Sequence, residues 1–196
     1  MDEIKKLSEL GDIQVNQAID VFIEGFYFTL SSVSKDREKL HKLFKSFLDY
    51  NMTYAYLQDG AAIGFLGLAD NQKRPVKLNR EVFTQIMGGF AAKTSYKAVS
   101  AAFEKVKDIG QQDILIDFIA TSPEHRSKGI GAQIIAFVRD TLGYKKIQLE
   151  TYSKNTRAIA FYERLGFRVI DIKKSLMMKL SGYGSLVTMR FDEEET

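Results

Sequence analysis

Two glycines with flanking cations form a segment whose residue types suggest phosphate chemistry. Arg126, Lys128, Gly129 and Gly131 follow the apolar run 113–121, which is typical of a buried strand, and precede an apolar helical stripe. The first turn of a helix leaves four N–H groups without partners, and glycine lets an anion approach them closely. The two cations add favourable charge. We interpret the segment as a phosphate-binding loop, with a turn that merely requires two glycines as the alternative.

The elements that must position this loop follow the pattern of one mixed α/β domain over residues 1–196. Apolar periodicity predicts helices near 14–30, 35–50, 129–142 and 155–165 and a less regular helical region over 79–106, interrupted at 88–89. Strands are predicted at 52–58, 62–68, 113–121, 146–152, 167–172 and 186–191, with a loop at 71–77. The Asp59-Gly60 pair predicts a hairpin between the first two strands.

Composition excludes several other classes of chemistry. The 196 residues are 45% hydrophobic and contain no cysteine, which removes disulfides, thiolate metal sites and a cysteine nucleophile. The two histidines, His41 and His125, have no second ligand at metal-binding spacing, so no metal is expected. With a net charge of +3 and no basic stripe with interleaved aromatics, no nucleic-acid partner is expected. The absence of a signal-peptide core or a long apolar run indicates a cytoplasmic protein without a membrane partner.

A second segment settles the interpretation of the first. Residues 126–131 read Arg-x-x-Gly-x-Gly, and residues 155–167 read Asn-x-x-Ala-x-x-Phe-Tyr-x-x-x-Gly-Phe. In this order, each led by a predicted strand, they resemble the two signatures of the GCN5-related N-acetyltransferase (GNAT) superfamily. The resemblance covers about 113–170 and implies that family's α/β fold with a mixed sheet. A helical insertion over 71–111 then separates the N-terminal hairpin from the pyrophosphate-loop strand. It could shape the acceptor site or serve as a packing or homodimer element.

The resemblance implies acetyl-CoA as the co-substrate and assigns the residues that hold it. The pantetheine arm would pair with the strand backbone of Ile119, Ala120 and Thr121, whose N–H groups could polarise the thioester carbonyl. The pyrophosphate would bind the N–H groups of Arg126, Ser127, Lys128, Gly129, Ile130, Gly131 and Ala132. Asn155, Ala158 and Phe161 would face the cofactor, and Asn155 is also a candidate helix N-cap.

Three residues are candidates for proton transfer under the same resemblance. Tyr162 shares a helical face with Ala158, Phe161 and Leu165. It would protonate the leaving thiolate, since a tyrosine with a reference pKa of ~10 is protonated at neutral pH. A hydrogen-bonded core tyrosine is the alternative. Glu150, 12 residues earlier, is a candidate general base. Asp117, placed by strand alternation on the face of Ile119, is the other. Each could instead be a hydrogen-bonded structural carboxylate, with a water relay serving a distant acid.

These assignments predict an acetyl-CoA-dependent N-acetyltransferase. With no thiol to carry the acetyl group, the acceptor would attack directly in a ternary complex. The expected acceptor is a primary amine on a small molecule or a peptide N-terminus. A catalytically inert module that binds acetyl-CoA or CoA is the alternative function. A nucleotide-binding α/β protein without acyl transfer would leave the 155–167 match unexplained.

Overall fold

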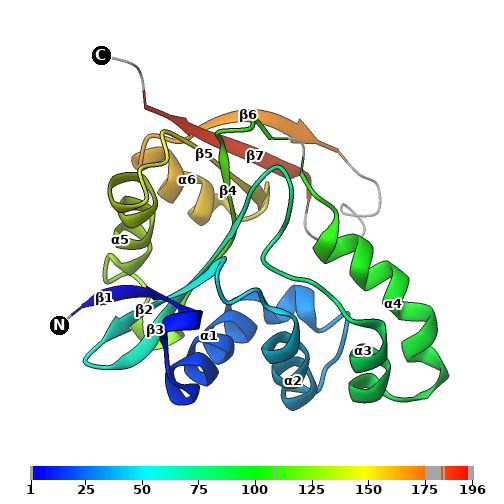
Figure 1. Ribbon diagram of the computed structural model, residues 1–196. Coiled ribbons are helices and arrows are strands. Elements are labelled where there is room, and N and C mark those ends of the chain that lie inside the picture. Colours follow the sequence, from blue (N-terminus) through cyan, green and yellow to red (C-terminus); the bar gives the residue numbers. More distant parts are fainter. Residues whose placement is uncertain (1, 108, 175–181, 183, 194–196) are drawn as a thin grey trace.

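A seven-stranded mixed sheet organises the chain (Figure 1). The computed structural model describes residues 2–107, 109–174, 182 and 184–193. The strands are β1 (Glu3–Lys6), β2 (Thr53–Gln58), β3 (Ala61–Ala69), β4 (Ile114–Thr121), β5 (Lys146–Tyr152), β6 (Arg168–Lys173) and β7 (Leu186–Asp192). Their spatial order is β1-β2-β3-β4-β5-β7-β6, with β4 and β5 parallel and the other neighbours antiparallel. The expected α/β fold with a mixed sheet is confirmed.

Helices cover both faces of this sheet. They are α1 (Asp12–Leu30), α2 (Arg37–Phe47), α3 (Arg80–Met87), α4 (Gly89–Glu104), α5 (Ile130–Ala136) and α6 (Thr156–Arg164). One buried cluster joins α1, α2 and the insertion helices to the sheet, with Phe22 packed edge-on against Phe118. A second cluster joins α5 and α6 to the opposite face around Ile134 and Leu149. Figure 1 shows α5 and α6 together, away from α1 and α2. No helix of the described residues is long and apolar enough to span a membrane.

The β2–β3 hairpin turns where the sequence predicted. Gln58 pairs with Ala61, so Asp59 and Gly60 form a two-residue loop. Their φ angles are 50° and 82°, and a type I′ hairpin turn requires positive φ at both positions. The turn therefore sets the pairing of Gln58 and Leu57 with β3, and a bulge shifts the register by one residue from Tyr56 onward.

A β-bulge interrupts the pairing of β4 with β3 close to the point where β4 and β5 stop pairing. Gly67 of β3 pairs with Phe118 and the next residue pairs with Ile116, so Asp117 has no residue opposite it. A bulge bends its strand and increases the local twist. The parallel pairing of β4 with β5 ends at Ile116 and Leu149, one residue before the bulge. Beyond this point β4 runs on to Thr121 with its β5-facing edge unpaired.

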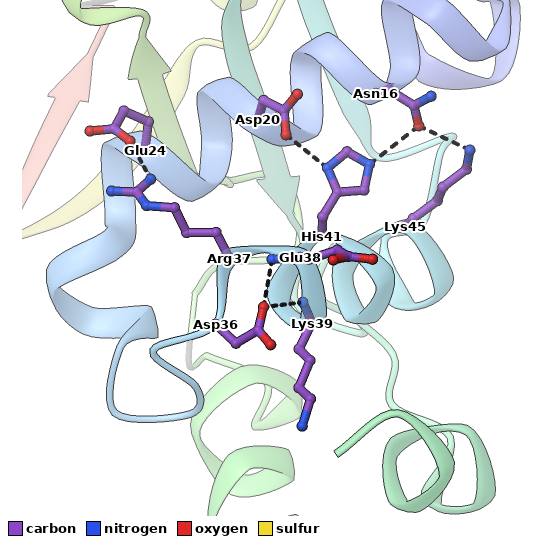
Figure 2. A network of polar contacts seen from close by, with 9 residues as sticks. All are labelled: Asn16, Asp20, Glu24, Asp36, Arg37, Glu38, Lys39, His41 and Lys45. Carbon is purple, nitrogen blue, oxygen red and sulfur yellow. Dashed lines mark hydrogen bonds and ion pairs between the residues drawn. The ribbon is translucent and has the colours of Figure 1, made fainter. Parts of the chain in front are cut away.

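Polar side chains fasten α2 to α1 (Figure 2). His41 of α2 lies between two α1 residues, with Nδ1 2.8 Å from Asp20 Oδ1 and Nε2 3.3 Å from Asn16 Oδ1. Lys45 Nζ donates to the same Asn16 oxygen at 2.9 Å. Asp36 caps the start of α2 by accepting two backbone N–H groups. These contacts explain His41 as a structural residue.

The insertion over 71–111 packs on its own chain. The backbone N–H of Lys77 donates to the Phe47 carbonyl, and the Asp49 N–H donates to the Pro75 carbonyl, each at 2.8 Å. These bonds attach the segment after β3 to the end of α2. The helices α3 and α4 then extend the layer that α1 and α2 begin, and the chain returns to β4.

The structure departs from the predicted elements in two places. The four-residue strand β1 was not predicted, because Glu3, Lys5 and Lys6 hide its apolar alternation; it pairs with β2 as an edge strand. The helix predicted over 129–142 is α-helical through Ala136 and then forms a π-helical turn, η3 (Phe137–Thr141). Short 3-10 turns, η1 (Leu7–Glu9) and η2 (Pro123–His125), complete the chain.

Candidate functional site

A cavity of about 760 Å³ lies beside the unpaired end of β4. It is enclosed by the last residues of β4, the loop into α5, and one face of α6. Most of the residues assigned to the cofactor line it: Ile119, Ala120, Thr121, Arg126, Ser127, Gly129, Ile130, Gly131, Ala132, Asn155, Ala158 and Phe161. Lys128 does not line it. Tyr162 does, whereas Glu150 and Asp117 lie outside its wall.

The loop into α5 presents a run of backbone donors. The Arg126 N–H donates to the Pro123 carbonyl and the Ala132 N–H to the Gly129 carbonyl, so these two amides are engaged within the loop. Between them, the amides of 127–131 have no acceptor among the described residues. Consecutive free amides at a helix start form an anion site. The donors present therefore fit a pyrophosphate.

Two residues with positive φ shape this loop. Gly129, the N-cap of α5, has φ 84°, and Ser127 has φ 64°. A left-handed conformation costs a residue with a side chain about 1 kcal/mol or more. The Ser127 hydroxyl accepts a hydrogen bond from Arg157 Nη2 at 2.7 Å, which ties α6 to the loop. Arg157 also lines the cavity and was not singled out from the sequence. Its place two residues after Asn155, in the second signature, was the available signal.

Glycine permits two close approaches around the cavity. A Cβ on Gly131 would lie 3.1 Å from Phe161 Cζ, so the first turn of α5 packs directly against α6. A Cβ on Gly25 would lie 2.6 Å from Ala120 Cβ, so α1 contacts β4 through its backbone. Gly25 is also part of the cavity wall. Both glycines keep the cavity narrow while leaving its backbone donors accessible.

Asn155 caps α6, as one of its two predicted roles requires. Its Oδ1 atom accepts the Ala158 N–H at 3.2 Å, and the Asn155 side chain also lines the cavity. The cap fixes the start of α6 immediately after β5. The helix consequently presents Ala158, Phe161 and Tyr162 toward the cavity.

Tyr162 is a buried phenol at the cavity wall. The residue is 8% exposed, and its ring packs against Phe161 and Phe167 at centroid distances of 5.2 and 5.8 Å. No described residue forms a hydrogen bond with its hydroxyl. Burial raises the pKa of Tyr162 to about 12, so the phenol keeps its proton at neutral pH. A protonated, unpartnered hydroxyl facing a cavity can donate to a bound molecule.

Glu150 stands on β5, one residue beyond the last β4–β5 pair. Its Oε2 atom accepts a hydrogen bond from Lys107 Nζ at 2.6 Å. The two side chains are 22% and 31% exposed, so water and small molecules can reach the pair. Lys107 belongs to the insertion, just after α4. The insertion thus reaches the edge of the gap between β4 and β5.

Asp117 lies in a different setting from the one that the sequence suggested. Ile116 and Ile119 pack against the α5–α6 cluster whereas Phe118 packs against the α1 cluster, so the bulge breaks the alternation that placed Asp117 with Ile119. Arg74 donates to both carboxylate oxygens, at 2.7 and 2.8 Å.

This pairing lies in the interior of the protein. The Asp117 and Arg74 side chains are 6% and 7% exposed. Burial raises the pKa of Asp117 above its ordinary value, and the Arg74 guanidinium opposes that rise. Both carboxylate oxygens are already occupied and little surface remains for a substrate. Of the two predicted bases, Glu150 is the accessible one.

The unpaired end of β4, the loop of free amides and the buried Tyr162 all border this one cavity. The model of the Acetyltransferase (GNAT) family matches residues 18–167, and the chain belongs to this family. No protein of curated function matches the sequence. In the described part of the chain no group of three or more histidine, aspartate or glutamate side chains could hold a metal ion.

Solved structures share the fold at low sequence identity. A Corynebacterium glutamicum protein described as histone acetyltransferase HPA2 and related acetyltransferase is 19% identical, with a TM-score of 0.64, covering 100% of this chain and 98% of that one. The Escherichia coli ribosomal-protein-S18-alanine N-acetyltransferase is 16% identical, with a TM-score of 0.56 and coverage of 100% and 97%. An Elizabethkingia anophelis GNAT family acetyltransferase with acetyl-CoA bound is 15% identical, with a TM-score of 0.54 and coverage of 98% of both chains. The whole chain therefore has the architecture of this family.

Proposed function

We propose that this protein transfers the acetyl group of acetyl-CoA to a primary amine, by direct attack in a ternary complex. The acceptor amine belongs to a small molecule or a peptide N-terminus. One observation carries the proposal: Tyr162, whose hydroxyl has no partner among the described residues, lines the same cavity as the loop with the free amides of 127–131. A proton donor and a pyrophosphate site in one cavity suit a thioester whose sulfur must be protonated as it leaves.

Different residues of the cavity bind different parts of acetyl-CoA. The amides of 127–131 bind the pyrophosphate, and Arg157 and Arg126 add positive charge at the same end. The unpaired edge of β4 offers backbone groups to the pantetheine arm, which would extend the sheet as an added strand. A backbone N–H near Ile119 would polarise the thioester carbonyl. A bound acetyl-CoA supplies the activated acetyl group.

Two side chains then move protons. Glu150 accepts a proton from the acceptor's ammonium group, either directly or through water, and the neutral amine attacks the acetyl carbonyl. The tetrahedral intermediate collapses with cleavage of the carbon–sulfur bond. Tyr162 donates its proton to the departing sulfur, for which its raised pKa keeps it protonated. No cysteine is present to form an acetyl-enzyme, which favours direct transfer over a two-step route.

A cofactor titration and an amine panel test this proposal separately. Acetyl-CoA is expected to raise the melting temperature by ligand linkage, and the increase should grow with cofactor concentration. CoA release is then measured with primary amines and peptides, with mass spectrometry of the acetylated product. Binding together with an acetylated amine supports the proposal. Binding without turnover across the panel supports an inert binding module, and no melting shift at millimolar acetyl-CoA would rule out both.

A further inference from the structure

A lysine of the insertion occupies the place where an acceptor amine is needed. Lys107 Nζ lies 2.6 Å from Glu150 Oε2, the oxygen of the proposed general base. Its side chain is a primary alkyl ammonium, the same chemical group as the proposed acceptor. An external amine that approaches Glu150 must therefore share this carboxylate with Lys107 or replace Lys107 there.

The neighbouring cation of the insertion contrasts with Lys107. Arg74 is buried against Asp117 through two hydrogen bonds, and a guanidinium keeps its proton and does not act as an amine nucleophile. Lys107 makes one hydrogen bond with the described residues, and its side chain remains 31% exposed on a flexible stem. Asp117 follows Ile116 and Glu150 follows Leu149, the last pair of β4 with β5, so both acids stand where the two strands stop pairing. One acid is held by two hydrogen bonds from a buried guanidinium, and the other is paired with a partly exposed amine.

We propose that Lys107 is an internal acceptor, acetylated within its own chain by acetyl-CoA when no external amine is bound. The inference rests on the proposed function, because it uses the same bound acetyl-CoA and the same two proton-transfer residues. It adds a modification site on the insertion, and it gives the insertion a chemical role at the acceptor side of the active site.

The reaction balances without another reagent. The Lys107 ammonium gives one proton to Glu150, and its nitrogen lone pair forms a bond to the acetyl carbonyl carbon. The carbon–sulfur bond breaks, and the sulfur takes a proton from Tyr162. The nitrogen loses its second proton, one proton restores the Tyr162 phenol, and the other leaves to water. The products are acetyl-lysine, which is uncharged, and CoA.

Acetylation also changes what Glu150 contacts. The neutral amide of acetyl-Lys107 no longer pairs with the carboxylate, since acetylation removes the lysine charge. Glu150 is then open to the ammonium group of an external acceptor. Acetylation of Lys107 would thereby free Glu150 to bind an external acceptor amine.

The test incubates the full chain with acetyl-CoA and no amine, and follows acetylation of each lysine by peptide mass spectrometry. Lys42 is the matched control, because its Nζ lies 2.7 Å from Glu38 Oε1 in a helix surface pair and its side chain is 60% exposed. Uncatalysed acetylation would favour the more exposed Lys42. We expect Lys107 to react about tenfold faster or more, a modest acid–base contribution.

Three further measurements complete the test. The first-order rate at Lys107 should not change on dilution of the protein, as transfer within one chain requires. Tyr162→Phe should slow acetylation at Lys107 and leave Lys42 unchanged. Lys107→Arg keeps a cation beside Glu150 but should remove the fast site, and the acetyl mark should not move to another lysine at the same rate.

Each outcome decides the inference. Equal or faster acetylation at Lys42, a rate at Lys107 proportional to protein concentration, or an undiminished rate in Tyr162→Phe would overturn it. An unmodified Lys107 in a protein that acetylates an external amine also overturns it and leaves the proposed function standing. A protein that does not bind acetyl-CoA at all overturns both.

Discussion

Replacing Tyr162 by phenylalanine removes one hydroxyl and leaves the ring in place. The ring contacts with Phe161 and Phe167 do not involve the oxygen. No described residue loses a hydrogen bond, so the free energy of unfolding should change by less than ~0.5 kcal/mol. The cofactor's phosphate site lies on the loop before α5, and the affinity for acetyl-CoA should stay within about threefold of the wild type.

Turnover should respond far more strongly than stability. A positioned general acid typically contributes a factor of about 100 to 10,000 to the rate. We expect kcat to fall by about 100-fold or more, which corresponds to ~2.7 kcal/mol of transition-state stabilisation. The reason is that the thiolate must otherwise leave without a proton or take one from water. This split between kcat and cofactor affinity is the signature of a residue that acts during the reaction.

The assay is favourable because the chain contains no cysteine. A thiol reagent therefore reports CoA release with no signal from the protein itself, using the amine that the panel identifies. Tyr54→Phe is the matched control: Tyr54 is 7% exposed, belongs to the same buried cluster, and stands on β2 outside the cavity wall. Burial raises its pKa as well. Its replacement should leave kcat unchanged.

The kinetics of Tyr162→Phe can contradict the proposed acid role of Tyr162. If Tyr162→Phe retains kcat within about threefold of the wild type, protonation of the sulfur does not depend on this phenol. If the variant instead loses stability and cofactor affinity together while kcat at saturation is kept, Tyr162 is a packing residue. An equal loss of kcat in Tyr54→Phe would show that the assay reads disturbance of the buried cluster.

Three other perturbations test the structure around the site. Arg74→Ala should destabilise the fold by about 3 kcal/mol, lowering the melting temperature by about 6–12 °C, because it leaves Asp117 buried without its partner; an unchanged denaturation midpoint would contradict the buried pair. Gly25→Ala should destabilise the fold by about 1 kcal/mol in urea unfolding, because contact with Ala120 outweighs the gain in helix propensity; a stabilised variant would refute the close approach. The raised pKa of Tyr162 stabilises the fold below pH ~10, and this contribution is lost as pH rises toward about 12. From about pH 9 to about pH 11.5 the free energy of unfolding should therefore fall by about 2 kcal/mol more in the wild type than in Tyr162→Phe. Equal falls in the two proteins, measured by urea unfolding, would disprove this expectation.

The hairpin turn, the helix cap and the glycine loop could be predicted from the sequence, because each depends on residues that are close together in the chain. Asp59 and Gly60 tolerate the positive φ that a two-residue hairpin demands, and both adopt it. Asn155 begins α6 because its side chain can accept an N–H three residues later. The glycines of the loop at 126–131 indicated a place where backbone donors are free. Each of these signals fits within a short stretch of chain.

The electrostatic environment of the acids could not be read in this way. Arg74 reaches Asp117, and Lys107 reaches Glu150, each across 43 positions of sequence. Such pairs depend on how the insertion packs, which no local pattern specifies. The bulge at Asp117 could not be predicted from the local sequence either, and it made the predicted side of the strand for Asp117 unreliable, because strand alternation assumes an unbroken ladder. Sequence patterns therefore located the candidate acids, while tertiary contacts distinguish the structural one from the accessible one.

Hydrogen exchange with and without acetyl-CoA tests most directly whether acetyl-CoA binds in this cavity, because the groups proposed to bind it are backbone amides. The amides of 127–131 lack acceptors in the described structure, and the β5-facing edge of β4 is unpaired beyond Ile116. Saturating acetyl-CoA should slow exchange at 127–131 and at 119–121, since these N–H groups gain acceptors and lose access to water. Exchange in β1, outside the cavity, should not change. Unaltered exchange in both cavity segments at millimolar acetyl-CoA would contradict the account.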